Sequence, residues 1–188
     1  MIFVPTELPG AMLVDVEPRA DARGWFARTY CEREFAAHGL PTRMVQSNVS
    51  VTHRAGTLRG MHWQAAPHQE DKLVRCVRGA VWDAIVDIRP GSATFCRWLG
   101  VALGEATGRA LLVPKGFAHG FISLTDEAVV VYQVSEFHAP QAERGARHDD
   151  PAFGIAWPRP VAVIADKDRA WPEFIAATAA SDPLKEHP

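Results

Sequence analysis

A chain of 188 residues, 47% of them hydrophobic, is long enough to bury a sizeable core, and its length predicts one domain over residues 1–188. A formal net charge of -2 leaves no basic field for nucleic acid. The longest apolar runs are too short to cross a bilayer, and the first residues lack the pattern of a secretory signal, so no membrane partner is expected. Three widely spaced cysteines favour reduced thiols in a cytoplasmic protein.

Strand signals dominate residues 11–137. Short runs rich in β-branched and aromatic residues are separated by glycine and proline breakers, roughly ten to fifteen residues apart. No long helical pattern lies between them, so the spacing favours a β-sandwich or jelly roll over alternating strands and helices. Residues 72–88 are the best candidate for a hairpin, because the second arm, residues 80–88, alternates regularly between two faces.

Helical signals are few. Residues 31–38 predict one short helix, which Gly39 and Pro41 would end. Residues 172–180 predict a second helix, and residues 181–188 form a polar tail that we expect to fray. No internal repeat, low-complexity tract or linker divides the chain.

Ionisable side chains occur in strand-like segments that are otherwise apolar: Arg59, His62, Lys72 and His119. Burying charge or imidazole there costs several kcal/mol unless each group has a partner or a function. Together these side chains supply a base, a cation for an oxyanion and a guanidinium for phosphate. The set therefore predicts an enzyme that acts on an anionic, carbonyl-bearing small molecule.

The period of a strand separates two of these residues. Arg59 and Met61 fall on one face of a regular strand, whereas Gly60 and His62 fall on the other. A bulge at Gly60, or the end of the strand, would bring Arg59 and His62 to one cavity. We therefore expect an irregularity here if the two residues act together.

Each candidate also has an ordinary structural interpretation. His62 and His119 could be hydrogen-bonded structural histidines, and Lys72 could be an edge-strand lysine that blocks aggregation. Tyr132 follows an apolar run that is typical of core aromatics. Asp168 lies in a charged run that, on composition alone, indicates a solvated surface.

A metal site is disfavoured. His62, Glu70 and His119 could supply ligands, but Gln64 stands where a His-x-His pair would need its second histidine. Lys72 nearby would repel a divalent ion. We therefore expect no metal, and a metal-dependent cupin oxygenase or isomerase is the least favoured alternative.

Many motifs of the chain occur in the same order in one known family. They include residues 21–26, 46–50, 58–64, 72–75, 79–83, 87–95, 114–121, 139–145, 149–151, 154–158 and 166–168. On these motifs the chain resembles the dTDP-4-dehydrorhamnose 3,5-epimerases over nearly its whole length. The resemblance implies a mainly β, cupin-like jelly roll (a double-stranded β-helix) with a few short helices. It also implies an isomerase of nucleotide-linked 4-keto-6-deoxy sugars.

The resemblance implies a role for each matching residue. The family's reaction removes a proton from a carbon next to the C4 ketone and returns one to the opposite face, without a cofactor. His62 matches the general base, and Asp168 matches the carboxylate that orients it. Lys72 matches the cation near the enolate oxygen, and Tyr132 matches the acid on the far side. The other matches are substrate-binding residues: Arg23, Gln46, Asn48, Arg59, Lys72, His119, Glu143 and Lys167.

The chain departs from the family pattern where the nucleotide base binds. Arg28 stands where the family usually has a glutamate, and Phe137-His138 stand where it often has two tyrosines. These three residues are expected to contact the base, so the carrier is either dTDP or another nucleotide such as CDP or GDP. Family members are dimers that exchange N-terminal strands, so the resemblance also implies a homodimer.

The expected reaction is epimerisation at C3, C5 or both, above all of dTDP-4-dehydro-6-deoxyglucose to dTDP-4-dehydrorhamnose through an enolate. One alternative is a mono-epimerase of a CDP- or GDP-linked ketosugar. Another is a sugar-nucleotide-binding cupin that lacks catalysis. The presence of His62 and Tyr132 at the base and acid positions argues against the non-catalytic alternative.

Overall fold

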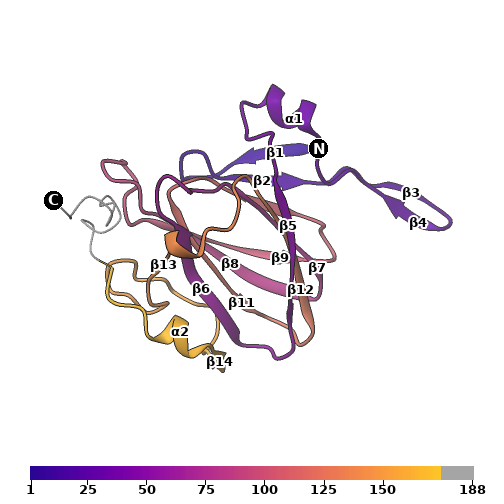
Figure 1. The fold of residues 1–188 in the computed structure, drawn as a ribbon. Coiled ribbons are helices and arrows are strands. Elements are labelled where there is room, and N and C mark those ends of the chain that lie inside the picture. The colour runs from indigo at the N-terminus through magenta and orange to yellow at the C-terminus, as the bar shows by residue number, and fades with distance from the viewer. Residues whose placement is uncertain (175–188) are drawn as a thin grey trace.

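Two β-sheets form the body of the molecule in the computed structural model, which describes residues 1–174 (Figure 1). The first sheet has the order β1 (Ile2–Pro5), β2 (Met12–Asp15), β10 (Ala110–Val113), β7 (Lys72–Arg78), β12 (Ala128–Val134) and β5 (Gln46–Thr52). The second has the order β13 (Glu143–Gly145), β6 (Thr57–Gln64), β11 (Phe117–Ser123), β8 (Ala80–Asp87) and β9 (Trp98–Gly104). The predicted mainly β fold is confirmed.

The main core fills the space between the two sheets. Val74 and Val130 of the first sheet pack with Ile85 and Phe121 of the second, and all four are almost completely buried. Sheet packing of this kind leaves alternate side chains of each strand facing inward. Strands whose inward positions turn polar at one point, such as β7 at Lys72, therefore mark where the core gives way to a cavity.

The predicted hairpin at residues 72–88 is wrong. The strands exist, as β7 and β8, but β7 pairs with β10 and β12 in the first sheet, whereas β8 pairs with β9 and β11 in the second. Gly79, with φ of +68°, turns the chain from one sheet to the other. The alternation predicted for β8 is present: Val81 and Ile85 enter the main core, while Ala84 and Val86 pack in a second cluster.

Short helices sit at the margins of the sheets. The predicted helix at residues 31–38 appears as α1 (Glu32–Ala37), and its buried Phe35 packs with Leu73 and Leu112 of the first sheet. A 3-10 turn (Pro140–Ala142) and α2 (Asp166–Arg169) come later in the chain. Of the helix predicted at residues 172–180, residues 172–174 have no regular structure, and the others lie outside the described residues, as does the predicted tail. No helix within residues 1–174 is long and apolar enough to span a membrane.

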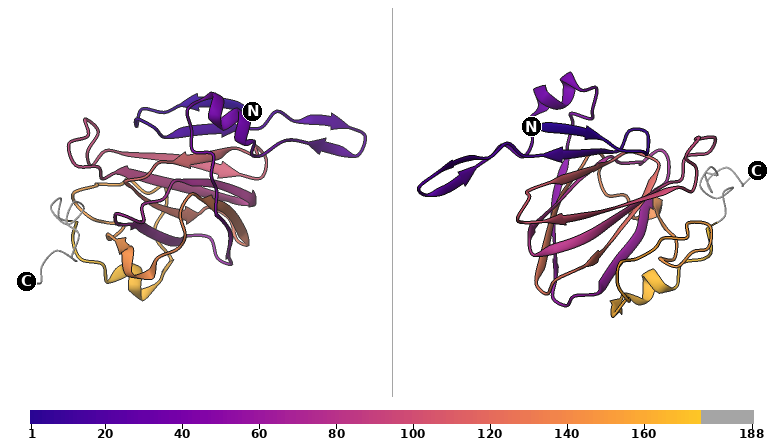
Figure 2. Two further views of the ribbon diagram at one scale, coloured as in Figure 1. Left: turned by 45° about the horizontal axis from the view of Figure 1, so that its top comes forward. Right: turned by 180° about the vertical axis from the view of Figure 1, so that it is seen from behind.

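Two small elements lie outside the main sheets or at their edge. β14 (Val163–Ile164) pairs in parallel with β6, and α2 follows it directly, beside the same strand (Figure 1). β3 (Arg19–Asp21) and β4 (Gly24–Phe26) form a two-stranded hairpin that extends away from the body (Figure 2). We call this hairpin, residues 19–26, the arm.

Candidate active site

A cavity opens between the two sheets and has two adjoining lobes, of about 470 and 440 Å³. His62, Lys72 and Tyr132 line both lobes and therefore stand where the lobes meet. The first lobe is also lined by Ser50, Thr57, Arg59, His119, Lys167 and Asp168. The second is also lined by Gln46, Asn48, Gln64, Glu70, His138 and Glu143.

A bulge in β6 brings Arg59 and His62 to the same cavity, which is one of the two irregularities expected from the sequence. His62 pairs with His119 of β11, but Arg59 pairs with Phe121, so β6 has one more residue than its partner over this stretch. Gly60 has φ of +127°, and a Cβ built there would lie 2.5 Å from the Cα of Gly120. Only glycine fits this conformation and this close approach.

His62 is held by a buried carboxylate from a distant part of the chain. Its Nε2 lies 2.6 Å from Oδ1 of Asp168, while Oδ2 of Asp168 accepts the backbone N–H of Gly60 at 3.2 Å. The side chain of Asp168 is 4% exposed and that of His62 is 27% exposed. The carboxylate is thus fixed on one side by the bulge, and the imidazole presents its other edge to the cavity.

The surroundings of Asp168 keep it ionised. Burial acts to raise the pKa of this carboxyl, but the hydrogen bond and charge of His62, the Gly60 N–H and Lys167 together outweigh it, and the pKa lies below its ordinary value. An ionised Asp168 accepts a hydrogen bond from the Nε2–H of His62, so the tautomer with hydrogen on Nε2 is favoured. The other ring nitrogen is then the one able to take up a proton.

Lys72 and His119 also have buried acidic partners. Nζ of Lys72 lies 3.1 Å from Oε1 of Glu70, with both side chains little more than a tenth exposed. Nε2 of His119 lies 3.0 Å from both carboxylate oxygens of Asp83, which is fully buried. His62, Lys72 and His119 therefore each have a partner that offsets the cost of desolvation.

Tyr132 approaches from the first sheet, whereas His62 belongs to the second. Tyr132 lies on β12 and faces the cavity alongside Lys72 of β7. Burial raises the pKa of its hydroxyl, the charge of Glu70 raises it further, and Arg59 only partly opposes them. The phenol is therefore protonated and able to donate near neutral pH.

Further residues predicted to bind substrate gather at the second lobe or beside it. Oε1 of Gln46 accepts the backbone N–H of His138 at 2.6 Å, and Asn48 lines the same lobe. Nζ of Lys167 donates to Oε1 of Glu143 at 2.6 Å, and this bond, opposed by burial, lowers the pKa of Glu143. Gln46, Asn48, Glu143 and Lys167 are thus within one cleft, although they come from distant parts of the sequence.

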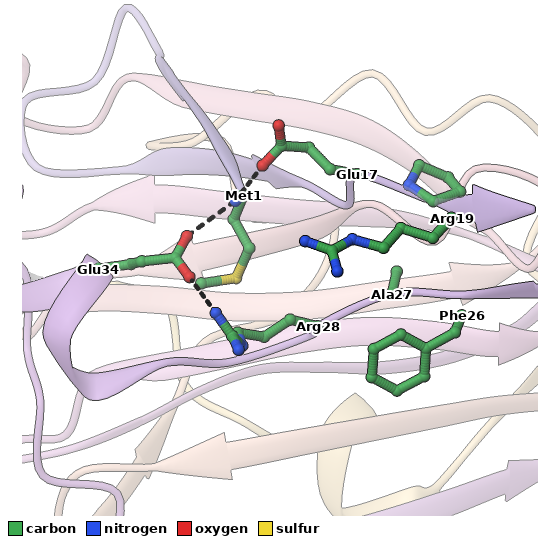
Figure 3. A pocket seen from close by; sticks show the side chains of 8 residues that line it. Met1, Glu17, Arg19, Phe26, Ala27, Arg28 and Glu34 are labelled. Atoms are coloured by element: carbon green, nitrogen blue, oxygen red, sulfur yellow. Dashed lines mark hydrogen bonds and ion pairs between the residues drawn. The ribbon is translucent and has the colours of Figure 1, made fainter.

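Three predicted binding residues are not brought to the cavity. Arg23 lies in the turn of the arm, with its side chain 89% exposed, and pairs with Asp21 at 2.6 Å. Arg28 pairs with Glu34 at 3.0 Å and lines a separate pocket of about 280 Å³ beside Met1 and Glu17 (Figure 3). The side chain of Phe137 is exposed, and its backbone carbonyl accepts a bond from Nε2 of Gln64.

Sequence reasoning missed Asp83 as a residue that supports the site. The sequence does contain a signal for Asp83, because a carboxylate in the middle of an apolar strand is as costly to bury as His62 or Lys72. Sequence reasoning considered Glu70 only as a possible metal ligand, whereas in the structure Glu70 pairs with Lys72. Within residues 1–174 no group of three or more metal-ligating side chains is found.

Comparison with known proteins places the chain in a family. The family model described as dTDP-4-dehydrorhamnose 3,5-epimerase matches residues 5–175. This chain belongs to the dTDP-4-dehydrorhamnose 3,5-epimerase family. It is 40% identical to the dTDP-4-dehydrorhamnose 3,5-epimerase of Methanothermobacter thermautotrophicus over 189 residues, 99% of this chain and 96% of the relative.

Solved structures of dTDP-4-dehydrorhamnose 3,5-epimerases and of a related epimerase agree with this. The Bacillus anthracis 3,5-epimerase, solved with TDP and PPi bound, superposes with a TM-score of 0.89 at 37% identity, over 92% of this chain and 99% of that one. A 3′-monoepimerase from Streptomyces bikiniensis, in complex with dTDP-quinovose, gives 0.84 at 36% identity, over 94% and 89%. The predicted cupin-like fold and the predicted enzyme class, an isomerase, are confirmed.

Proposed function

We propose that this protein converts dTDP-4-dehydro-6-deoxyglucose to dTDP-4-dehydrorhamnose by epimerisation at C3 and C5, with His62 as base and Tyr132 as acid. The observation that carries the proposal is that these two side chains enter one cavity from opposite sheets, on β6 and β12. Inversion needs a proton donor on the face opposite the base, because a single group would tend to return the proton to its original face.

His62 removes the proton from the substrate. The C4 ketone of the substrate acidifies the neighbouring C–H bonds, so no cofactor is needed. The ring nitrogen of His62 that is not bonded to Asp168 takes the proton, and the 2.6 Å bond to Asp168 orients the imidazole and stabilises the imidazolium that forms. A base positioned in this way contributes about 10²–10⁴-fold to the rate.

Lys72 stabilises the enolate that results. Negative charge develops on the former ketone oxygen, and an ammonium group in a largely enclosed cavity lowers the energy of that charge more than it would in water. Glu70 holds Nζ of Lys72 at the junction of the two lobes. Tyr132, protonated because its pKa is raised, then delivers a proton to the carbon from the other side.

The sugar nucleotide is bound along the cleft. Arg59 is anchored by its Nη2 to the backbone oxygen of Val51 at 3.1 Å, and Lys167 lies in the same lobe, so both cations suit a diphosphate. Gln46, Asn48 and His138 suit the nucleoside in the second lobe. The TDP and dTDP-sugar ligands of the two solved relatives support dTDP as the carrier.

A homodimer completes this account of the binding site. Arg23 and Arg28 lie away from the cavity of their own chain, and an isolated two-stranded hairpin such as the arm gains little stability by itself. The outer face of the first sheet also exposes Val49, Val51 and Val77. We infer that a second copy covers this face and that each arm reaches the cleft of the partner subunit.

Epimerisation at C3 alone is the second candidate. The observation in its favour is the similarity to the Streptomyces bikiniensis enzyme, which is named as a 3′-monoepimerase at an identity close to that of the Bacillus anthracis 3,5-epimerase. The same base, cation and acid serve either outcome, since both proceed through an enolate. The two candidates differ only in whether C5 is also deprotonated.

Replacing the base tests the proposed chemistry. The variant His62→Ala should lose turnover by about 10²–10⁴-fold while binding dTDP with unchanged affinity, because its side chain acts on the sugar. His53→Ala is the matched control, since His53 is exposed and bonded only to Glu127 at the surface. Turnover that survives in His62→Ala, or that falls equally in both variants, refutes the assignment.

A further inference from the structure

We propose that Trp171 is a positioning residue for the His62–Asp168 pair, and that Gly145 is a glycine in order to make room for it. This inference rests on the proposed function, because it assigns Trp171 a role through the base. Trp171 follows Asp168 by three residues, just past the end of α2. Its indole meets the imidazole of His62 edge-on, with ring centroids 6.4 Å apart and planes at 67°.

The position of Gly145 ties the indole to His62. Gly145 of β13 is the cross-strand partner of His62 of β6. A Cβ built at residue 145 would lie 2.2 Å from Cε2 of Trp171, so the indole occupies the space that a side chain there would fill. Gly145 is not among the glycines with positive φ, so its backbone would accept any residue. The contact with Trp171 is therefore the reason for glycine at this point.

The unpaired indole nitrogen indicates that Trp171 acts by filling space and not by hydrogen bonding. Nε1 of Trp171 is buried and finds no hydrogen-bond partner among residues 1–174. An unpaired buried donor costs free energy of folding, which a phenylalanine here would avoid. Since Nε1 packs against Gly145 instead of facing substrate, the ring contributes by filling the wall beside His62.

The chain segments before and after Trp171 are both held in place, which fixes the position of the indole beside His62. Before it, β14 pairs with β6 and α2 carries Asp168 to His62. After it, the backbone N–H of Phe174 donates to the buried Asp150 at 2.7 Å, and the Phe174 ring packs on Phe153 at 4.8 Å. Residues 163–174 are thus held at both ends, with the His62 contacts between.

Kinetics of Trp171 variants test the proposal. In Trp171→Ala we expect kcat to fall about 10- to 100-fold with little change in KM or in dTDP affinity, because a misplaced base slows the chemical step and leaves binding intact. Trp171→Phe should recover most of the rate. Trp157→Phe is the control, since the ring of Trp157 packs on Trp82 and not on His62, and it should lower thermal stability without lowering kcat.

A double-variant cycle tests whether Gly145 acts through Trp171. Gly145→Ala should lower kcat in the wild-type background and have little further effect in Trp171→Ala, where the obstructed ring is gone. Equal effects in the two backgrounds would overturn the link. Wild-type kcat in Trp171→Ala, or a fall in kcat in the Trp157→Phe control as large as that in Trp171→Ala, would overturn the positioning role.

A readout independent of turnover separates this proposal from the proposed function. The Nε2 proton of His62, bonded to Asp168, can be followed by ¹⁵N-edited NMR. It should exchange with solvent faster in Trp171→Ala than in the wild type or in Trp157→Phe. Faster exchange in a protein that turns over no ketosugar would leave the positioning role intact and reject the function. If exchange in Trp171→Ala equals that in the wild type, and the wild type is active, the positioning role is rejected and the proposed function stands.

Discussion

At the scale of single residues, the site consists of ionisable side chains that would be costly to bury alone. His62, Lys72 and His119 each have a carboxylate within 3.1 Å, from Asp168, Glu70 and Asp83 respectively. Breaking a buried pair of this kind leaves an uncompensated group and is more costly than losing a surface ion pair. The pairs therefore fix the direction of the side chains that meet the substrate.

Tyr132→Phe separates the two halves of the reaction. Removing the hydroxyl should spare proton abstraction by His62 on the other sheet but remove the donor that completes inversion. We expect exchange of substrate protons with solvent to continue while net epimerisation falls by at least about tenfold. Tyr30→Phe serves as control, because Tyr30 packs against α1 and bonds Thr42. Normal epimerisation in Tyr132→Phe would make Tyr132 a packing residue only.

At the scale of elements, the sequence predicted strands better than it predicted their partners. The alternation of residues 80–88 was correct, yet the hairpin with residues 72–78 was wrong. Alternation reports which side chains share a face, and in a sandwich both faces of β8 are covered. It says nothing about the sheet to which the next strand belongs, and a glycine turn such as Gly79 permits either connection.

In the site, too, the sequence predicted local features better than contacts between distant segments. The need to bring Arg59 and His62 together indicated either a bulge at Gly60 or a strand end, and the structure has the bulge. Asp168 could not be found in this way, because a four-residue helix in a charged run has no periodicity, and its buried carboxylate bonds to Gly60 and His62, which are distant in sequence. Only the family resemblance identified it. Arg23 and Arg28 were expected in the site on the same grounds, but a single chain leaves them outside it.

The loop between β8 and β9 provides a stability prediction. Asp87, fully buried, accepts bonds from Arg89, Ser92 and Thr94 at 2.6–2.7 Å. Burial acts to raise its pKa, but these bonds outweigh burial and lower the pKa to about 2. A lowered pKa stabilises the fold above the unfolded value near 4, and this stabilisation is lost as the pH falls toward 2.

Asp87→Asn should therefore reduce the free energy of unfolding by about 2 kcal/mol at pH 7, and by much less at pH 2.5. Urea unfolding at the two pH values measures the difference. Asp149→Asn is the control, because Asp149 is half-exposed and pairs with Arg147 at the surface, where such pairs contribute little. An equal loss at both pH values would mean that the asparagine acts through packing instead of charge.

At the scale of the whole molecule, the proposed binding site needs a second copy of the chain. The arm extends away from the body (Figure 2) and exposes Trp25 and Phe26, and the outer face of the first sheet is apolar at Val49 and Val51. Arg75 lies on that sheet with one guanidinium nitrogen unpaired among the described residues. A partner subunit on this face would bury the apolar side chains and bring its arm to the cleft.

Sedimentation tests this assembly. The wild type should sediment at twice its chain mass of 20.6 kDa, whereas Val49→Asp should weaken the dimer and raise KM for the sugar nucleotide. Val49→Thr, which keeps the branched side chain, is the control. Arg23→Ala should leave the dimer intact and raise KM alone. A wild-type monomer with full activity would exclude the exchange of arms.

The most direct test of the central claim is the reaction itself, followed by NMR in D2O with dTDP-4-dehydro-6-deoxyglucose as substrate. We expect the wild type to introduce deuterium at both C3 and C5 and to yield dTDP-4-dehydrorhamnose. Deuterium at C3 alone would contradict double epimerisation in favour of the mono-epimerase. Deuterium at neither carbon, with protein that binds dTDP, would contradict the claim that His62 and Tyr132 epimerise this sugar.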